Sequence, residues 1–407
     1  MPDTLKPNKV EVDAPGRAAW QSGLPLDHLR VAAAILMRAG VRLADNPRAA
    51  ASEDWHRAFS QGEKLAERDL GSLVAYVGNR EGLFGPDRHV TIPVVEQILA
   101  HPPAARATSA IFGTVIDFQA SRQFDEFRGD SLSGGWVRFG ERQSVNRTGE
   151  RVRLFDTPTF RKLAAGGQAD EIQIQAEAET TLGGRFAGRA KIDEQDIADD
   201  RIDLLTDAIP RIMARGARRS ILDRLFYLLL SNPNTADGNA LFSSAHGNTY
   251  TNALAVGALQ TAIQAMIEQT DTPEATTGTV NVYPRAVVCA AALSTTAREI
   301  VNALRIPEDS TDPIQLIVRE DGRIGNGVID PIGGTEQSGS DTAWFLASGD
   351  RQARDAAIAV EFREGTNMAP VIVSAPLSSG EWGIEIGAYV DAAVTVLDWR
   401  GLVRGNS

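Results

Sequence analysis

The residue types that could carry out nucleophilic chemistry lie closest together in the stretch SSAHGN, residues 243–248. A histidine beside a serine can act as the base that activates the hydroxyl group. The sequence shows neither an orienting acid nor an oxyanion motif with this pair. We therefore interpret His246 as a loop histidine that hydrogen-bonds the backbone of its turn-rich connector. A cytoplasmic hydrolase that uses Ser243 and His246 is kept as an alternative.

Other motifs with chemical meaning are weak or absent. The five histidines are scattered, and no pair has the spacing of zinc ligands. The stretch GGRFAG, residues 183–188, lacks the strand-then-helix context of a nucleotide-binding loop. Cys289 stands in the apolar run AVVCAA and is expected to be a buried core residue. We predict no catalytic residue, no cofactor and no metal, and we do not expect an enzyme.

Length and composition are those of a globular protein with more than one lobe. The chain has 407 residues, of which 43% are hydrophobic and 23% charged. Its net charge of −12 disfavours a nucleic-acid binder that works through a broad basic surface. No apolar run approaches the ~20 residues needed to span a bilayer. A single cysteine and an N-terminus without an apolar signal region fit a reducing cytoplasm.

Periodicity in the sequence predicts both helices and strands. Helices are expected at residues 25–40, 52–70, 92–103 and 253–269, and strand followed by turn and helix over 280–304. Strands are expected at 107–121 and 134–141, and the C-terminal part is expected to be rich in strands from residue 314 onward.

A strand hairpin is predicted from Glu171 to Ile192. Apolar residues alternate with glutamates and glutamines at period two up to Glu179, and the glycines of LGG, residues 182–184, suit the tip. The apolar face of this hairpin is thin. A two-stranded hairpin alone is marginally stable in water, so this one needs another surface to lie against.

The longest helical pattern follows, from Ile202 to about Leu230. Asp199 and Asp200 stand at its start, where acidic residues complement the helix dipole. Pro210 should bend it. Its basic residues recur at helical spacing, which most often marks a solvated face. They are Arg211, Arg215, Arg218 and Arg219.

An ordered set of stretches from about residue 165 to 407 resembles the major capsid proteins of tailed phages, especially the Mu-like major head subunits and capsid domains joined to a prohead protease. The stretches are GRFAGRAKIDEQDIADD, ADGNALFSSAHGNTYT, ALQTAIQAMIEQ, VNVYPRAVVCAAALSTTAREIV, TAWFLAS and VLDWRGLVRGN. Their order and spacing carry the resemblance.

The resemblance implies an α+β Hong Kong 97-type fold with an N-terminal arm, an extended loop, a peripheral domain with a spine helix, and an axial domain. We expect the N-terminal arm and helical region at 1–125, peripheral strands and the extended loop at 126–200, and the spine helix and connector at 201–250. The axial domain would cover 251–340, and 341–407 would return through the peripheral domain to a final axial strand.

In such a shell, the hairpin would be the extended loop and would lie on a neighbouring subunit. Its expected contact residues are Ile172, Ile174, Glu177, Glu179, Leu182, Arg185 and Phe186. Its acidic face would suit an adjacent basic stripe of Arg211, Arg215 and Arg218. Because the tip TTLGGRFAG has no lysine, we expect no covalent cross-link of the lysine type found in some capsids of this fold.

The function implied is a major head protein that self-assembles into pentamers and hexamers of an icosahedral shell around phage double-stranded DNA. Expected partners are further copies of the chain, portal, scaffold and decoration proteins, and packaged DNA without sequence-specific binding; no membrane is involved. Its place would be the virion, after assembly in the host bacterial cytoplasm. The alternative with the same fold is an encapsulin-like nanocompartment that encloses a cargo enzyme.

Overall fold

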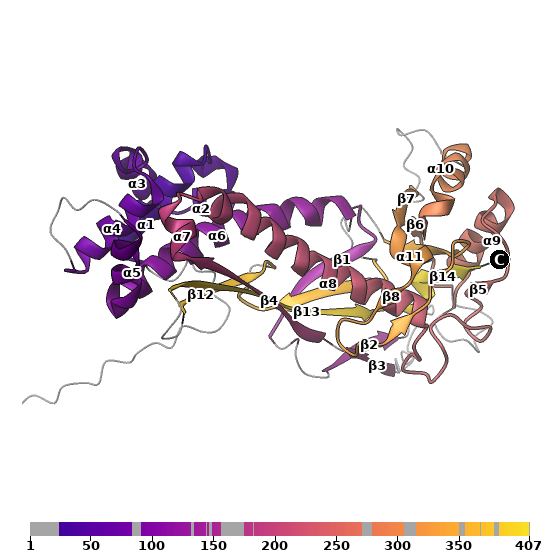
Figure 1. The fold of residues 1–407 in the computed structure, drawn as a ribbon. Coiled ribbons are helices and arrows are strands. Elements are labelled where there is room, and N and C mark those ends of the chain that lie inside the picture. Colours follow the sequence, from indigo (N-terminus) through magenta and orange to yellow (C-terminus); the bar gives the residue numbers. More distant parts are fainter. Residues whose placement is uncertain are drawn as a thin grey trace, which may run out of the picture. The chain divides into compact units, whose positions relative to one another are not determined.

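The structure is a computed structural model, and it contains both helices and sheets (Figure 1). It describes residues 24–83, 91–131, 134–143, 145, 149–155, 175–181, 183–270, 279–304, 315–349, 355–366, 368–377 and 382–406. The chain forms two compact units, each assembled from three segments. The first comprises Met1–Glu126, Ala187–Ala217 and Glu364–Val390; the second comprises Phe127–Phe186, Arg218–Arg363 and Asp391–Ser407.

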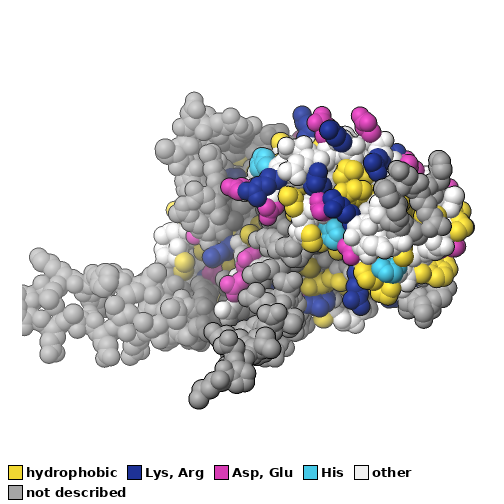
Figure 2. All heavy atoms as spheres, turned by 90° about the vertical axis from the view of Figure 1, so that its left-hand side faces the viewer, with side chains coloured by type: hydrophobic (Ala, Val, Ile, Leu, Met, Phe, Trp, Pro, Cys, Tyr) yellow, Lys and Arg dark blue, Asp and Glu magenta, His cyan; other side chains and the backbone are white. Residues whose placement is uncertain are grey.

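The first unit is mainly helical. Its helices are α1 (Leu26–Arg38), α2 (Pro47–Ala50), α3 (Glu53–Gly62), α4 (Leu70–Arg80), α5 (Ile92–Ala100), most of α6 (Pro102–Ser131) and α7 (Glu194–Ala198). Their apolar faces share one buried cluster. The predictions at 25–40 and 92–103 are confirmed, and α3 lies within the predicted 52–70. On the face shown in Figure 2, acidic and basic side chains are intermixed.

The strand predicted at 107–121 is wrong, because this segment is the middle of α6. Nearly every residue from 104 to 124 is buried. A helix surrounded by protein lacks the polar face that normally reveals its period of 3.6 residues. Its β-branched and aromatic residues, such as Phe112, Val115 and Ile116, then look like a buried strand.

The long predicted helix is confirmed, from Ile202 to Ser231. A π-helical turn occupies Leu204–Ala208, and α8 continues over Ile209–Ser231. The backbone N–H of Ile209 donates to the carbonyl of Leu204, five residues earlier. Pro210, which has no N–H and crowds the preceding turn, follows at once. The departure from regular α-helix therefore falls where the sequence placed a bend.

The strands around β13 (Gly383–Val396) form one sheet. In the first unit β12 (Val371–Pro376) pairs with the N-terminal part of β13. In the second unit β11 (Ile358–Arg363) pairs with its C-terminal part, and β1 (Val137–Arg142) runs parallel to β11. β4 (Gly183–Asp193) also pairs with β13. The predicted strands at 134–141 and in the C-terminal part are thus confirmed.

A second sheet lies wholly in the second unit, with strand order β5-β14-β10-β6-β7. The strands are β5 (Thr249–Tyr250), β6 (Pro284–Ala290), β7 (Ile317–Asp321), β10 (Trp344–Ser348) and β14 (Leu402–Gly405). β6 and β7 are parallel, and α10 (Ser294–Ala303) lies between them in the chain. α9 (Val256–Ile267) shares their core. The short elements α11 (Gly322–Asn326), β8 (Val328–Ile329) and β9 (Glu336–Gln337) follow β7.

The predicted hairpin over 171–192 is wrong in its pairing. β3 (Gln175–Thr181) does not pair with β4; it pairs in antiparallel fashion with β2 (Gly149–Phe155) in a separate two-stranded sheet. β4 instead belongs to the β13 sheet. The period-two pattern indicated strands correctly, but period alone does not select a partner. The segment that joins the paired strands is 156–174, which lies outside the described residues.

Candidate functional site

The connector around His246 is a closed hydrogen-bond cluster. The imidazole Nδ1 lies 3.1 Å from the carbonyl oxygen of Leu241, and Nε2 lies 2.7 Å from Oδ2 of Asp237. The ring is fully buried and stacks on the indole of Trp399 at 3.9 Å. The Ser243 hydroxyl accepts from the backbone N–H of His246. Both ring nitrogens thus face other acceptors, which confirms the structural interpretation of His246 and does not place its imidazole as a base for Ser243.

Asp237 is the acid that sequence reasoning missed, because it stands in a turn-rich stretch nine residues before His246. Burial alone would raise the pKa of Asp237. Hydrogen bonds from Thr235, His246 and Asn239 outweigh that effect and hold its pKa well below the usual range. The carboxylate therefore stays ionised and fixes the connector through several donors.

Cys289 is confirmed as a core residue of β6. Burial, together with the negative charge of Glu320, raises the pKa of its thiol to about 11. A thiol in this state is a poor nucleophile.

The described residues also show no group of three or more His, Cys, Asp or Glu side chains placed to hold a metal ion. In the same part of the chain, no helix is long and apolar enough to cross a membrane.

Two carboxylate–arginine contacts that the sequence did not reveal hold the long helix, one near its start and one in its second half. Near its start, Asp200 accepts from the guanidinium of Arg38 and, at 2.7 Å, from the backbone N–H of Leu70. In its second half, Asp330 accepts from Arg224 at 3.0 Å, and both side chains are more than nine-tenths buried. The sequence placed Asp200 only as a complement to the helix dipole, because its partner Arg38 lies 162 residues away in the chain.

The arginines of the predicted basic stripe have different surroundings in the structure. Arg211 contacts Asp207 of its own helix at 2.5 Å. Arg215 is exposed, whereas Arg218 is half-buried. Ile212, beside Arg211, is 66% exposed, which is unusual for a large apolar side chain on a helix. The exposed apolar residue and Arg215 make this stretch of the helix a candidate contact surface.

The described members of the predicted hairpin contact set lie in two different sheets. Arg185 lies in β4, where it donates to the buried carboxylate of Asp391 at 2.8 Å, and Phe186 follows it in the same strand. Glu177 and Glu179 lie in β3. The others fall outside the described residues: Ile172, Ile174 and Leu182.

The register of β2 and β3 revises the chemistry expected of the strand pair that they form. Arg153 stands opposite Glu177, and Arg151 opposite Glu179. Residues directly opposite in a ladder stand on the same face, so the register places these two glutamates and two arginines of the same chain at positions on one face. The other face carries apolar residues from both strands, among them Val152 opposite Ala178. We name β2 and β3 together the arm.

Fold and site together define a structural subunit, an α+β chain whose candidate chemical residues are used to hold its own connector and helices. Residues 178–405 match the family model described as phage capsid protein. The chain belongs to this phage capsid protein family. Its α+β architecture is consistent with the Hong Kong 97-type fold, and its place is the capsid of the virion, where copies form an icosahedral shell.

Several solved structures are similar to the chain. The capsid of the cyanophage P-SCSP1u shares 11% identity at a TM-score of 0.43, covering 67% of this chain and 88% of that chain. A structure from Gordonia phage Cozz shares 12% at a TM-score of 0.39, covering 67% and 84%. One from Microbacterium phage Oxtober96 shares 15% at a TM-score of 0.38, covering 67% and 91%. The search of curated proteins finds no match.

Proposed function

We propose that this chain is the major head protein whose pentamers and hexamers close the shell around packaged double-stranded DNA. The family match from β3 to β14 carries the proposal. Copies that meet through two different surfaces generate closed rings when the rotation closes, which is how one chain can build rings of five and six. The shell would be a product of association and not of catalysis, and the chain would act without a cofactor.

The arm is proposed as the extended loop, at 149–181 instead of 171–192. Its two strands form a sheet of their own, apart from both larger sheets. Two strands are marginally stable in water, and an open strand edge invites pairing with another chain. A neighbouring subunit would cover the apolar face that includes Val152 and Ala178. Lys162 lies in the segment between the strands, so the lysine-free tip no longer argues against a cross-link.

The helix surface at Ile212 and Arg215 is proposed as part of the contact between copies. Arg211 is already engaged by Asp207, so Arg215 supplies the exposed charge. Burying Ile212 at a contact would remove apolar surface from water, which favours association by roughly 25 cal/mol per Å2. Replacing Ile212 by aspartate should therefore weaken assembly, whereas replacing the exposed Arg219 on the same helix by glutamine should change it little.

An assignment of the axial domain is also proposed. The sheet of β5, β14, β10, β6 and β7, with α9 and α10, would be the axial domain near the symmetry axes. Portal, scaffold and decoration proteins would bind the assembled shell. The net charge of −12 suits an inner wall that does not grip packaged DNA. The nanocompartment alternative is not favoured, because the matching family is that of phage capsid proteins.

Deleting the arm tests the proposal. Residues 149–181 are replaced by a short glycine-serine linker, and shells are sought by electron microscopy and sedimentation of the overexpressed chain. We expect closed particles from the wild type and soluble, folded subunits without particles from the variant. Circular dichroism and a thermal melt check the folding. An intact wild-type chain that stays monomeric at high concentration would contradict the shell, and an unfolded variant would contradict the peripheral role of the arm.

A further inference from the structure

The two most exposed large apolar side chains of the described residues each lie next to an exposed charged residue. Ile212 of α8 is 66% exposed, and Ile329 of β8 is 59% exposed. Arg215 lies almost one helical turn after Ile212, and Glu336 of β9 stands directly opposite Ile329 in the β8–β9 ladder. An apolar group rimmed by polar residues is a feature of contact surfaces. We call Ile212 with Arg215 the helix surface and Ile329 with Glu336 the groove surface.

The groove surface lies on the wall of an open groove in the second unit. Residues of α8, α11, β8 and β9 line this groove. Successive residues of a strand point to opposite faces, so Ile329 and Glu336 share one face of the two short strands. Val328, on the other face, is only 7% exposed. The outer face of this strand pair is therefore the one available to a second molecule.

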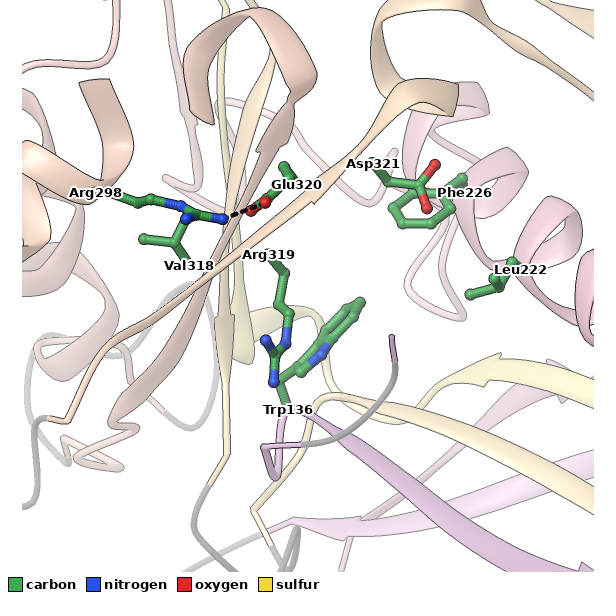
Figure 3. A pocket seen from close by; sticks show the side chains of 8 residues that line it. All are labelled: Trp136, Leu222, Phe226, Arg298, Val318, Arg319, Glu320 and Asp321. Atoms are coloured by element: carbon green, nitrogen blue, oxygen red, sulfur yellow. Dashed lines mark hydrogen bonds and ion pairs between the residues drawn. The ribbon is translucent and has the colours of Figure 1, made fainter. Parts of the chain in front are cut away.

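Glu336 brings an unmatched negative charge to this groove. The other carboxylates of the groove are engaged by arginines; Asp321, for example, accepts from Arg323. The adjoining cavity shares Asp321 with the groove, and there Glu320 accepts from Arg298, which is drawn as a dashed line in Figure 3. In the described part of the chain, Glu336 has no such partner. The groove can therefore take a cation from a second molecule.

The helix surface carries the opposite charge. Arg215 contacts no carboxylate among the described residues. Residues three apart on a helix have Cβ atoms about 5 to 6 Å apart, and residues directly opposite in an antiparallel ladder have Cβ atoms about 5 Å apart. The apolar group and the charge are thus spaced alike on the two surfaces. Ile212 can cover Ile329 at the same time as Arg215 pairs with Glu336.

We propose that the helix surface of one copy docks on the groove surface of a second copy. Because the two surfaces differ, each copy can give its helix surface to one neighbour and receive the helix surface of another, and such contacts close into rings. Opposite charges fix this pairing, since a contact between two helix surfaces would bring like charges together. This inference rests on the proposed shell function, to which it adds the surface that the helix meets.

Charge reversal tests this contact in the overexpressed chain, with shells measured by sedimentation and electron microscopy. Arg215→Glu and Glu336→Arg, each alone, should raise the subunit concentration needed for shells at least about tenfold, because like charges then meet. The double variant restores the pair with its signs exchanged, so it should return to within about threefold of wild type. Glu299→Arg is the matched control and should behave like wild type. Glu299 is an exposed glutamate of the same unit that also has no partner among the described residues.

A cross-link tests the same contact whether or not shells form. Ile212→Cys and a tagged Ile329→Cys are mixed at high concentration under oxidising conditions, in which the natural Cys289 stays buried. Mixed dimers should exceed dimers of either variant alone at least about tenfold, because docking brings the two new thiols together.

The outcomes separate this contact from the proposed function. With shells in the wild type, single reversals that assemble equally well, or a double reversal that assembles no better than the single ones, would overturn the contact. Mixed dimers no more frequent than the others would overturn it too. A wild type that never forms shells would contradict the proposed function, while the cross-link would still decide the contact.

Discussion

The ion pair between Arg224 and Asp330, buried on both sides, should contribute strongly to the stability of the second unit. Arg224 lies on α8 and Asp330 follows β8, so the pair fastens the β8–β9 segment to the long helix. The perturbation is Arg224→Met, which keeps most of the side-chain volume and removes the charge. Among the described residues, the carboxylate of Asp330 then keeps its hydrogen bond from the backbone N–H of Ile332, at 3.1 Å.

The magnitude follows from burial. The side chains of Arg224 and Asp330 are 7% and 8% exposed, so water cannot replace the lost partner. Breaking a pair buried in this way costs about 3 to 5 kcal/mol, and we expect Arg224→Met to lower the free energy of unfolding by about 3 kcal/mol. Asp330→Asn retains an acceptor and should cost about 2 kcal/mol.

The assay is urea unfolding of unassembled subunits, followed by tryptophan fluorescence. Arg219→Met is the matched control, since Arg219 lies on the same helix, contacts Asp223 at 3.5 Å and is 79% exposed. It should change the free energy of unfolding by less than about 1 kcal/mol. The double variant Arg224→Met with Asp330→Asn should cost about 2 kcal/mol less than the sum of the single variants, because no charge is then left unpaired.

Two results would refute this reasoning. The first is a cost for Arg224→Met no greater than that of Arg219→Met. The second is strict additivity in the double variant, because independent residues do not share a buried contact.

Asp200→Asn, which tolerates the left-handed φ, should lower the free energy of unfolding at pH 7 by about 1 to 2 kcal/mol, and the exposed Asp199→Asn should not. Burial alone would raise the pKa of Asp200, but hydrogen bonds from Arg38 and Leu70 outweigh it and lower the pKa below the unfolded value of 3.8. The stability difference between wild type and Asp200→Asn should therefore shrink as the pH falls below 3.8. A stability difference that persists in acid would be inconsistent with an ionised Asp200. Cys289 should react with a thiol reagent at pH 8 only as the subunit unfolds; rapid labelling of folded protein would disprove its burial. Gly405→Ala should cost about 1 to 3 kcal/mol in thermal melts, because a Cβ there would meet the indole packed against it, whereas Gly188→Ala, which meets nothing, should be neutral.

The sequence alone determined the elements whose period or punctuation is local. α1 ends at Arg38, two residues before Gly40, α5 stops before Pro102, and the long helix carries its irregular turn just before Pro210. Alternation predicted strands at β3 and β4, and the apolar run around Cys289 predicted a buried strand. The same residue-level reasoning assigned His246 a structural role. Each of these properties depends on neighbours in the chain, so the residues themselves specify it.

Only the tertiary structure decided what joins residues far apart. The sequence of the middle of α6 predicts a strand, because a helix buried on nearly all sides has no polar face to reveal its period. β3 could have turned back onto β4, yet it pairs with β2, so the segment of sequence that joins the paired strands is 156–174, which includes Lys162. Asp200 was expected to cap a dipole and instead engages Arg38, 162 residues away. Strand partners and buried ion pairs are chosen by the total packing of the chain, and no local pattern encodes that choice.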